Sequence, residues 1–98
     1  MIIRIVKLSF HAKYISNFKT IFDENKQKII SQKGCIRLEM LKDVKDVNVI
    51  FTYSWWNSME DLNNYRNSEL FKDIWSRTKI LFNNKPEAWS TKKINEVL

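Results

Sequence analysis

The first third of the chain changes from the alternation of a strand to the period of a helix. Residues 2–10, IIRIVKLSF, are rich in β-branched side chains and predict a β-strand. Apolar side chains fall on both of its faces, which is typical of a strand covered on both sides. From Ala12 to about Gln32 the apolar positions follow one helical stripe, in which Asn25 takes the place of an expected apolar residue. Gly34 then ends the helix, as a glycine at a helix C-terminus commonly does.

A β-hairpin is expected next. Residues 35–41 alternate between apolar and more polar side chains, and residues 47–56 form a second strong strand pattern. The polar segment 42–46 joins them, so the two strands are expected to pair with one another.

The last part of the chain predicts two helical segments and a closing strand. Ser58 suits the N-cap of a short helix that runs to about Arg66. A second helical pattern then continues to about Asn83. Pro86 breaks it, and residues 87–94 are expected to form the last strand.

The resulting order, β-α-β-β-α-β, predicts one α+β domain of the ferredoxin-like class over residues 1–98. In this class helices cover one face of an antiparallel four-stranded sheet. The strand at 47–56 places a bulky apolar row on the opposite face, and leaving that row in water would expose a large apolar patch. We therefore expect a homodimer, a dimeric α+β barrel in which two sheets pack together. The expected dimer-interface residues are Val49, Phe51, Tyr53 and Trp55.

Two adjacent tryptophans, Trp55 and Trp56, end this strand. Successive strand residues point to opposite faces, so Trp55 belongs to the predicted interface and Trp56 to the row beneath the helices. Thr52 and Ser54 share the row of Trp56, and such small polar side chains leave room for a cavity and offer hydroxyl groups to it. Trp56 is then either a core residue whose indole N–H finds an acceptor or part of a cavity wall.

Charge and cysteine content bear on the class of partner. The 98 residues carry a formal net charge of +6, but the seventeen basic residues are scattered and form no nucleic-acid-binding motif, so we expect no nucleic-acid partner. The single cysteine, Cys35, excludes an internal disulfide framework, and one cysteine with one histidine provides no metal-site spacing. There is no signal-peptide pattern and no apolar run of membrane-spanning length. We therefore expect a cytoplasmic protein without membrane contact.

Three segments carry a family resemblance. Gly34 and Cys35 open the second strand, and the segment 53–71 combines a strand-end Trp, an acid-rich helix and a Ser-x-x-Phe pattern. KPEAWS at 85–90 lies where the closing strand is expected to start. In these features residues 2–95 resemble the antibiotic biosynthesis monooxygenase superfamily of dimeric α+β barrels. That superfamily includes cofactor-free monooxygenases acting on aromatic polyketides, heme-degrading enzymes, isomerases and decarboxylases, so the resemblance implies a fold without fixing a substrate.

Few functional positions carry over from this resemblance. Trp56 matches the strand-end Trp that commonly lines the pocket of the family, and Tyr65 stands where many members have a histidine. Heme-degrading members use an Asn on the first strand, a Trp on the short helix and a heme-ligating His on the long helix. These positions fall on Val6 or Lys7, on Tyr65 and on Trp75. None is retained, and Trp cannot ligate iron as His does, so we expect no heme and no other cofactor.

Cofactor-free oxygenation needs an apolar cavity for an electron-rich substrate, and groups that help to remove a proton and stabilise the anion. We predict Tyr65 and Asn25 as catalytic candidates. The predicted substrate-binding residues are Trp56, Trp75, Thr52, Ser54, Lys7 and Phe22. The main candidates also have structural alternatives, as core or helix-edge residues or, for Lys7, as a solvated strand residue.

Two classes of function remain open at this stage. One is a cofactor-independent, monooxygenase-like enzyme acting on a small aromatic or quinone-like metabolite. The other is a non-catalytic dimeric module that binds a small hydrophobic ligand or a protein. A cavity with Tyr65 or Asn25 pointing inward favours the enzyme, and a pocket filled by Trp56 and Trp75 favours the module. His11, the only histidine, lies between the first strand and the first helix, where it is typical of a turn residue and cannot complete a Ser-His-Asp set.

Overall fold

The computed structural model describes all 98 residues and has the predicted order of elements. Its strands are β1 (Ile2–Ser9), β2 (Cys35–Lys42), β3 (Val49–Trp56) and β4 (Glu87–Thr91). Its helices are α1 (Ile15–Ile30), α2 (Met59–Arg66) and α3 (Glu69–Thr78), with single 3₁₀ turns at Ala12–Tyr14 and Lys79–Leu81. The fold is therefore the predicted ferredoxin-like α+β class.

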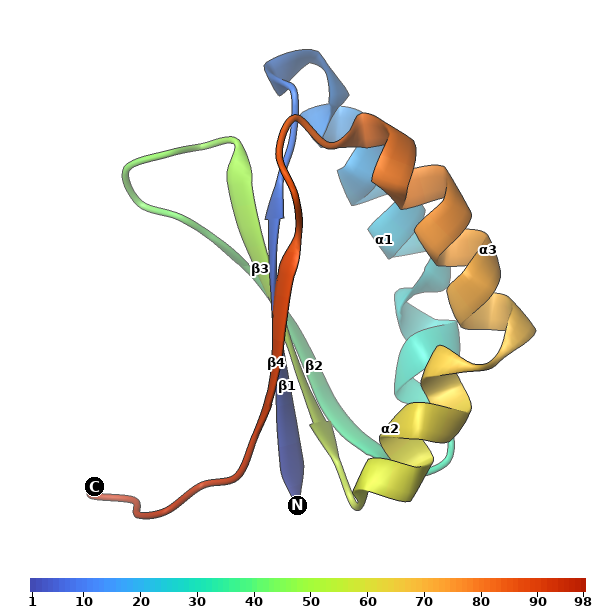
Figure 1. The fold of residues 1–98 in the computed structure, drawn as a ribbon, viewed down its shortest axis with the longest axis vertical. Coiled ribbons are helices and arrows are strands. Elements are labelled where there is room, and N and C mark those ends of the chain that lie inside the picture. The colour runs from blue at the N-terminus through green and yellow to red at the C-terminus, as the bar shows by residue number, and fades with distance from the viewer.

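The four strands form one antiparallel sheet in the order β2-β3-β1-β4. The register places Val6 of β1 opposite Thr52 of β3 on one side and opposite Ala88 of β4 on the other. In Figure 1 all three helices lie against one face of the sheet, and no element of the chain covers the other face. The C-terminus lies on that uncovered side. No helix is both long and apolar enough to cross a membrane.

Local signals explain where the helices begin. The side-chain oxygen of Ser58 accepts a hydrogen bond from the backbone N–H of Asp61 at 3.1 Å and caps α2. In the same way, Ser68 accepts from the N–H of Phe71 at 3.1 Å and caps α3. The second cap separates two helices that would otherwise form one, and lets α3 take its own path across the sheet.

Gly34 connects the end of α1 to β2 in the left-handed region, with φ of +83°. A side chain there would be strained, because left-handed backbone brings Cβ close to the following carbonyl oxygen. A Cβ at this position would also lie only 2.5 Å from the Cβ of Asp61 in α2. The glycine is thus required both by the turn and by the close approach of α2.

Two strand boundaries differ from the prediction by two or more residues. The last strand ends at Thr91 rather than residue 94, because Thr91 pairs with Ile3 near the start of β1 and almost no partner strand remains beyond it. The third strand begins at Val49 rather than residue 47. There the Asp46 carbonyl accepts from the N–H of Val49 at 3.1 Å and closes a turn.

The core consists of two separate clusters at opposite ends of the helix-covered face. Strands β1 and β3 contribute to both clusters. Ile2 and Trp56, at one end of the strand pair, belong to one cluster, and Leu8 and Ile50, near the other end, belong to the second. A series of aromatic contacts runs through both clusters. Its rings are those of Trp56, Tyr65, Phe71, Trp75, Phe82, Phe10, Phe18 and Phe22.

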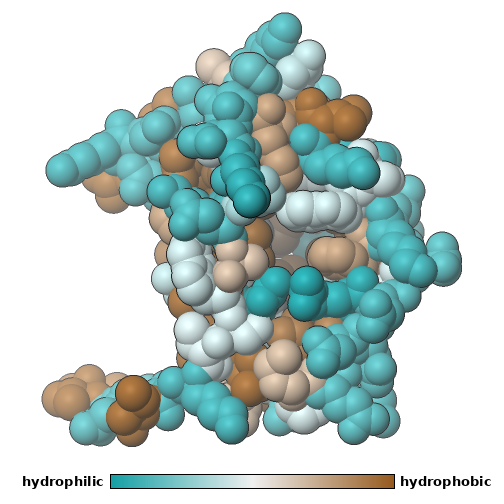
Figure 2. Space-filling model, viewed as in Figure 1, coloured by the Kyte–Doolittle hydropathy of each residue, from teal (hydrophilic) through white to brown (hydrophobic).

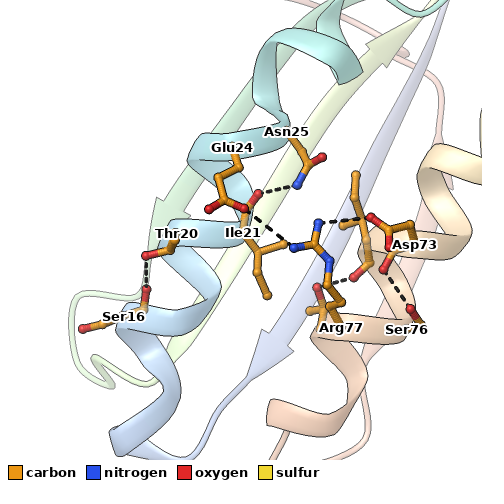
Figure 3. Close-up of polar contacts among 10 residues, drawn as sticks. Ser16, Thr20, Ile21, Glu24, Asn25, Asp73, Ser76 and Arg77 are labelled. Carbon is orange, nitrogen blue, oxygen red and sulfur yellow. Dashed lines mark hydrogen bonds and ion pairs between the residues drawn. The ribbon is translucent and has the colours of Figure 1, made fainter.

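A polar bridge joins α1 to α3 on the outer side of the helical layer (Figure 3). The guanidinium of Arg77 lies 3.1 Å from a carboxylate oxygen of Asp73 in its own helix and 3.7 Å from one of Glu24 in α1. These groups are about half exposed, so the contribution of the bridge to stability is small.

Candidate functional site

A cavity of about 350 Å³ lies between the sheet and the helices. On β1 and β3 it occupies the stretch between the two core clusters, where Arg4, Val6, Thr52 and Ser54 face the helices. Val6, Thr52 and Ser54 are small, so the middle of this face stays open. Bulky core residues fill both of its ends. The volume is at the lower end of the range for small-ligand sites.

The wall of the cavity is mostly apolar and aromatic. Thirteen of the 21 residues that line it are hydrophobic, among them Phe22 of α1 and both Phe71 and Trp75 of α3. Figure 2 shows a hollow on the face where β4 borders α3, with hydrophilic side chains along its lower rim. The exposed residue Glu87 lines the cavity at the start of β4. The cavity is therefore reached from solvent past the β4 edge of the sheet.

Asn25 is a polar group inside this apolar wall. Its side chain is only 3% exposed, and its Nδ2 donates a hydrogen bond to the carbonyl oxygen of Ile21 at 2.7 Å (Figure 3). That bond turns the amide, so that Oδ1 is the atom without a protein donor. Oδ1 accepts no hydrogen bond in the protein and is not fully buried, since the one buried side-chain N or O atom without a partner is Nε of Arg77. An unpaired carbonyl oxygen on a residue that lines a cavity is available to a hydroxyl or N–H group of a ligand.

Tyr65 brings a phenol to the same cavity. Its ring is stacked on Trp56, with centroids 5.1 Å apart, and meets the edge of Phe71 at 5.3 Å. Burial, and to a lesser degree the neighbouring thiol of Cys35, raise the pKa of Tyr65 well above its usual value. The group therefore stays protonated at physiological pH and acts as a hydrogen-bond donor rather than as a base.

Most of the predicted site residues line the cavity together. Besides Tyr65 and Asn25 these are Thr52, Ser54, Phe22 and Trp75. Trp75 is part of the wall and does not fill the space. This arrangement brings together an amide, a phenol, two hydroxyl groups and aromatic rings from α1, α2, α3 and β3.

Two predicted ligand contacts do not reach the cavity. Trp56 is fully buried, because its indole is covered by Tyr65 and its Nε1 donates to the hydroxyl of Ser54 at 2.9 Å. Of the two roles left open for it, the structure assigns the core one. Lys7 lies between Val6 and Leu8, which both line the cavity, so strand alternation sends Lys7 to the uncovered face. Neither residue lines the cavity, and a contact of either with a ligand stays a prediction.

Two arginines that we did not predict line the cavity. They are Arg4 of β1 and Arg66 at the end of α2. The signal for Arg4 was present in the sequence, since it shares the strand face of Val6 and Leu8. Arg66 had no comparable signal, because its approach to Arg4 depends on how α2 crosses the sheet.

His11 and Cys35 have no apparent place in this chemistry. His11 is exposed beside Tyr14, at the end of the molecule where β1 passes into α1. Cys35 is half-buried, and burial raises the pKa of its thiol, so it has little thiolate at neutral pH. No group of three or more His, Cys, Asp or Glu side chains is arranged to hold a metal ion.

The fold and the cavity define a class of protein: a small α+β domain with one sheet face uncovered and a ligand-sized space under the helices. The family model for antibiotic biosynthesis monooxygenases matches residues 1–76. The chain therefore belongs to the antibiotic biosynthesis monooxygenase family. Among curated proteins none matches it in sequence.

Solved structures share the fold at low sequence identity. A conserved protein from Methanosarcina mazei Go1 is 17% identical, with a TM-score of 0.88 over 95% of this chain and 93% of that one. A structure described as an antibiotic biosynthesis monooxygenase is 14% identical, with a TM-score of 0.89 over 97% and 100% of the two chains. A candidate antibiotic biosynthesis monooxygenase from Nitrosomonas europaea is 15% identical, with a TM-score of 0.88 over 97% and 100%. At these identities the likeness concerns the fold.

Proposed function

We propose that this protein is a cofactor-independent monooxygenase that oxidises a small aromatic or quinol-like metabolite in the cavity between the sheet and the helices. The observation that carries the proposal is an apolar cavity bordered by two hydrogen-bonding groups with free capacity, the Asn25 amide and the Tyr65 phenol. Membership of the family over residues 1–76 supports the same reaction class.

The proposed reaction converts a C–H group of a phenolic ring into a carbonyl group, with dioxygen as the oxidant. Loss of the phenolic proton makes the ring electron-rich, and the ring transfers electrons to dioxygen and forms a C–O bond. The hydroperoxide then loses water as its O–O bond breaks and the former C–H proton departs. One oxygen atom enters the product and the other becomes water, with all four electrons coming from substrate.

The side chains of the cavity fit roles in this scheme. Asn25 accepts a hydrogen bond from a substrate hydroxyl through its unpaired Oδ1. Tyr65, which stays protonated, donates to the oxyanion that develops on the substrate, a role in which a well-placed donor contributes about 10²–10³-fold in rate. Trp75 and Phe22 hold the aromatic ring. The phenolic proton leaves to solvent at the rim near Glu87.

A non-catalytic binding module is the weaker alternative. It was expected to have a pocket filled by Trp56 and Trp75, but Trp56 lies beneath the wall and Trp75 borders an open space. Asn25 and Tyr65 both line this space, which supports an enzyme.

We also propose that the protein works as a homodimer in the cytoplasm. On the uncovered sheet face, Phe51, Tyr53 and Trp55 remain half-exposed, and Trp89 is 44% exposed. An apolar row of this length in water marks an interaction surface. A second copy covers it with the same row, sheet against sheet, as an isologous interface. A free thiol without a disulfide suits a reducing compartment.

Oxygen uptake tests the proposed reaction directly. A panel of naphthols and hydroquinones is offered to the protein in an oxygen electrode, with spontaneous oxidation subtracted, and hits are repeated under ¹⁸O₂. We expect uptake and one ¹⁸O atom in the product. Tyr65→Phe is expected to lower kcat by about 10²-fold, while Tyr14→Phe, which removes a hydroxyl outside the cavity, leaves kcat unchanged. Absence of uptake above the spontaneous rate with compounds shown to bind would refute the enzyme.

A further inference from the structure

The cavity contains two arginines that the proposed oxygenation chemistry does not use. Arg4 projects from the middle of the sheet, between Ser54 of β3 and Ser90 of β4 in the strand register. Its Nη1 donates to the hydroxyl of Ser90 at 2.9 Å. Arg66 reaches the same cavity from the last residue of α2.

Neither guanidinium has an acidic partner. The other two arginines of the chain are both paired, Arg37 with Glu39 and Arg77 with Asp73 and Glu24. No ion pair of the protein includes Arg4 or Arg66. Glu87 is the only acidic residue that lines the cavity, and it forms no ion pair with either. The cavity wall therefore carries two positive charges against one negative charge.

The positive charge of Arg66 also acts on Arg4. Burial, and after it the positive charge of Arg66, lower the pKa of the Arg4 guanidinium. An arginine nevertheless stays charged at physiological pH. Arg4 is partly buried and Arg66 is exposed, so solvent screens only part of the repulsion between the two like charges. An anion between them removes this repulsion and satisfies the free N–H donors.

We propose that the natural ligand of this cavity is an aromatic carboxylic acid, whose carboxylate is held by Arg4 and Arg66 while its ring lies against Trp75 and Phe22. The proposal rests on the proposed use of the cavity as a substrate site and names the class of substrate. Guanidinium groups match a carboxylate with parallel N–H···O bonds, and such charge-assisted bonds are the strong ones. The hydroxyl of Ser54, beside Arg4 on the sheet, adds a neutral polar contact.

The remaining polar groups orient such a ligand. Asn25 lies on the helical wall and Arg4 on the sheet wall, so they approach a bound ring system from opposite layers. The free Oδ1 of Asn25 accepts from a hydroxyl group, and the arginines accept no hydrogen bond at all. A hydroxylated aromatic acid therefore has one productive orientation. When the arginines hold the carboxylate, the hydroxyl group of the ligand points to Asn25.

Calorimetric binding of a matched pair of ligands tests the inference without turnover. The pair is 2-naphthoate and 2-naphthamide, which share size and ring but differ in charge, and neither is a phenol. We expect the wild-type protein to bind the carboxylate at least tenfold more tightly than the amide. Arg4→Gln and Arg66→Gln each reduce that ratio, and the double variant brings it close to one. Lys72→Gln, which removes an exposed positive charge of α3 outside the cavity, leaves the ratio unchanged.

The outcomes separate this inference from the proposed reaction. Equal affinity of the wild-type protein for the two ligands overturns the anion site and leaves the cavity open to neutral substrates. A ratio unaffected by both arginine variants, with folding verified by circular dichroism, overturns the assignment to Arg4 and Arg66. If either variant fails to fold, the wild-type comparison still decides whether the cavity selects a carboxylate. A clear preference for naphthoate without oxygen uptake on any naphthol or hydroxynaphthoate supports the ligand class and contradicts the monooxygenase.

Discussion

The indole of Trp56 lies against the ring of Tyr65, with centroids 5.1 Å apart and the planes 21° from parallel. The same indole donates from Nε1 to the hydroxyl of Ser54 at 2.9 Å. Tyr65 and Ser54 both line the cavity, whereas Trp56 itself has no exposed surface. Trp56 is thus a positioning residue, which holds one cavity residue by stacking and another by a hydrogen bond.

Removal of the Trp56 indole is expected to be costly for stability. Trp56→Ala leaves a large void in the cluster of Ile2 and Leu62, and large-to-small changes of this kind cost about 3–5 kcal/mol. Urea denaturation followed by circular dichroism measures the loss. Ile80→Ala is the control, because Ile80 is 72% exposed on the helical side, away from the proposed interface, and its truncation is expected to cost less than about 1 kcal/mol. A similar loss for both variants would show that Trp56 is not the packing centre of this cluster.

Gly34→Ala is expected to destabilise the fold through the backbone. The left-handed conformation alone costs about 1–2 kcal/mol for a residue with a Cβ. The new Cβ also overlaps Asp61, so the total exceeds that value unless α2 shifts away. Thermal and urea unfolding measure the change. Lys33→Ala, at the preceding exposed position, is expected to stay within about 0.5 kcal/mol of the wild type, and a neutral Gly34→Ala would contradict the close approach of α2.

The raised pKa of Tyr65 predicts a loss of stability in alkaline solution. The unfolded chain releases the phenolic proton near pH 10, while the folded chain retains it to higher pH. Above pH 10 the folded state therefore binds more protons than the unfolded state, and the free energy of unfolding falls by up to about 1.4 kcal/mol per pH unit. Below pH 10 this contribution is complete and independent of pH.

Denaturation of the wild type and Tyr65→Phe between pH 8 and pH 11 isolates that contribution. Lysine titration affects both proteins equally, so the difference between their slopes reports Tyr65. We expect the wild type to lose stability faster than Tyr65→Phe above pH 10. Tyr14→Phe should retain the slope of the wild type, and a Tyr65→Phe slope equal to the wild-type slope would show that the phenol is not held in its neutral form by burial.

The uncovered sheet face predicts a charge-sensitive dimer. Sedimentation of the wild type at micromolar concentration is expected to show twice the mass of the chain. Trp55→Glu replaces an indole whose centroid lies 6.1 Å from the Tyr53 ring with a carboxylate in the proposed interface, and is expected to yield folded monomer. Ile80→Glu tests the effect of a new charge at an exposed apolar residue on the helical side of the molecule, and should remain dimeric. A wild type that sediments as a stable monomer would disprove the interface.

Most of the fold could be predicted because its signals are local. Ser58 and Ser68 cap the helices through bonds only three residues long, and Gly34 marks a turn that few other residues can make. The largest strand-boundary error lies where the boundary depends on a distant partner. The last strand stops at Thr91 because β1 offers little beyond Ile3, and nothing in residues 92–94 themselves signals that end.

The cavity could be predicted in part because strand alternation also is local. The small hydroxyl residues Thr52 and Ser54 indicated space beneath the helices, and Asn25 marked an interruption of the apolar stripe. The same rule, applied strictly to β1, would have placed Lys7 on the opposite face and Arg4 in the cavity. No local rule predicts the role of Trp56, because an indole on the helix-covered face can either border a cavity or lie beneath its wall.

By itself the sequence determined which face of each strand is apolar, where α2 begins and ends, and hence the order and layering of the fold. These properties depend on the period of the side chains and on contacts within a few residues. Only the tertiary structure decided which side chains meet in the cavity. The path of α2 across the sheet covers Trp56 with Tyr65 and brings Arg66 to the cavity of Arg4, residues 62 positions apart in the chain. Such meetings follow from the packing of whole elements, and the proposed anion site depends on one of them.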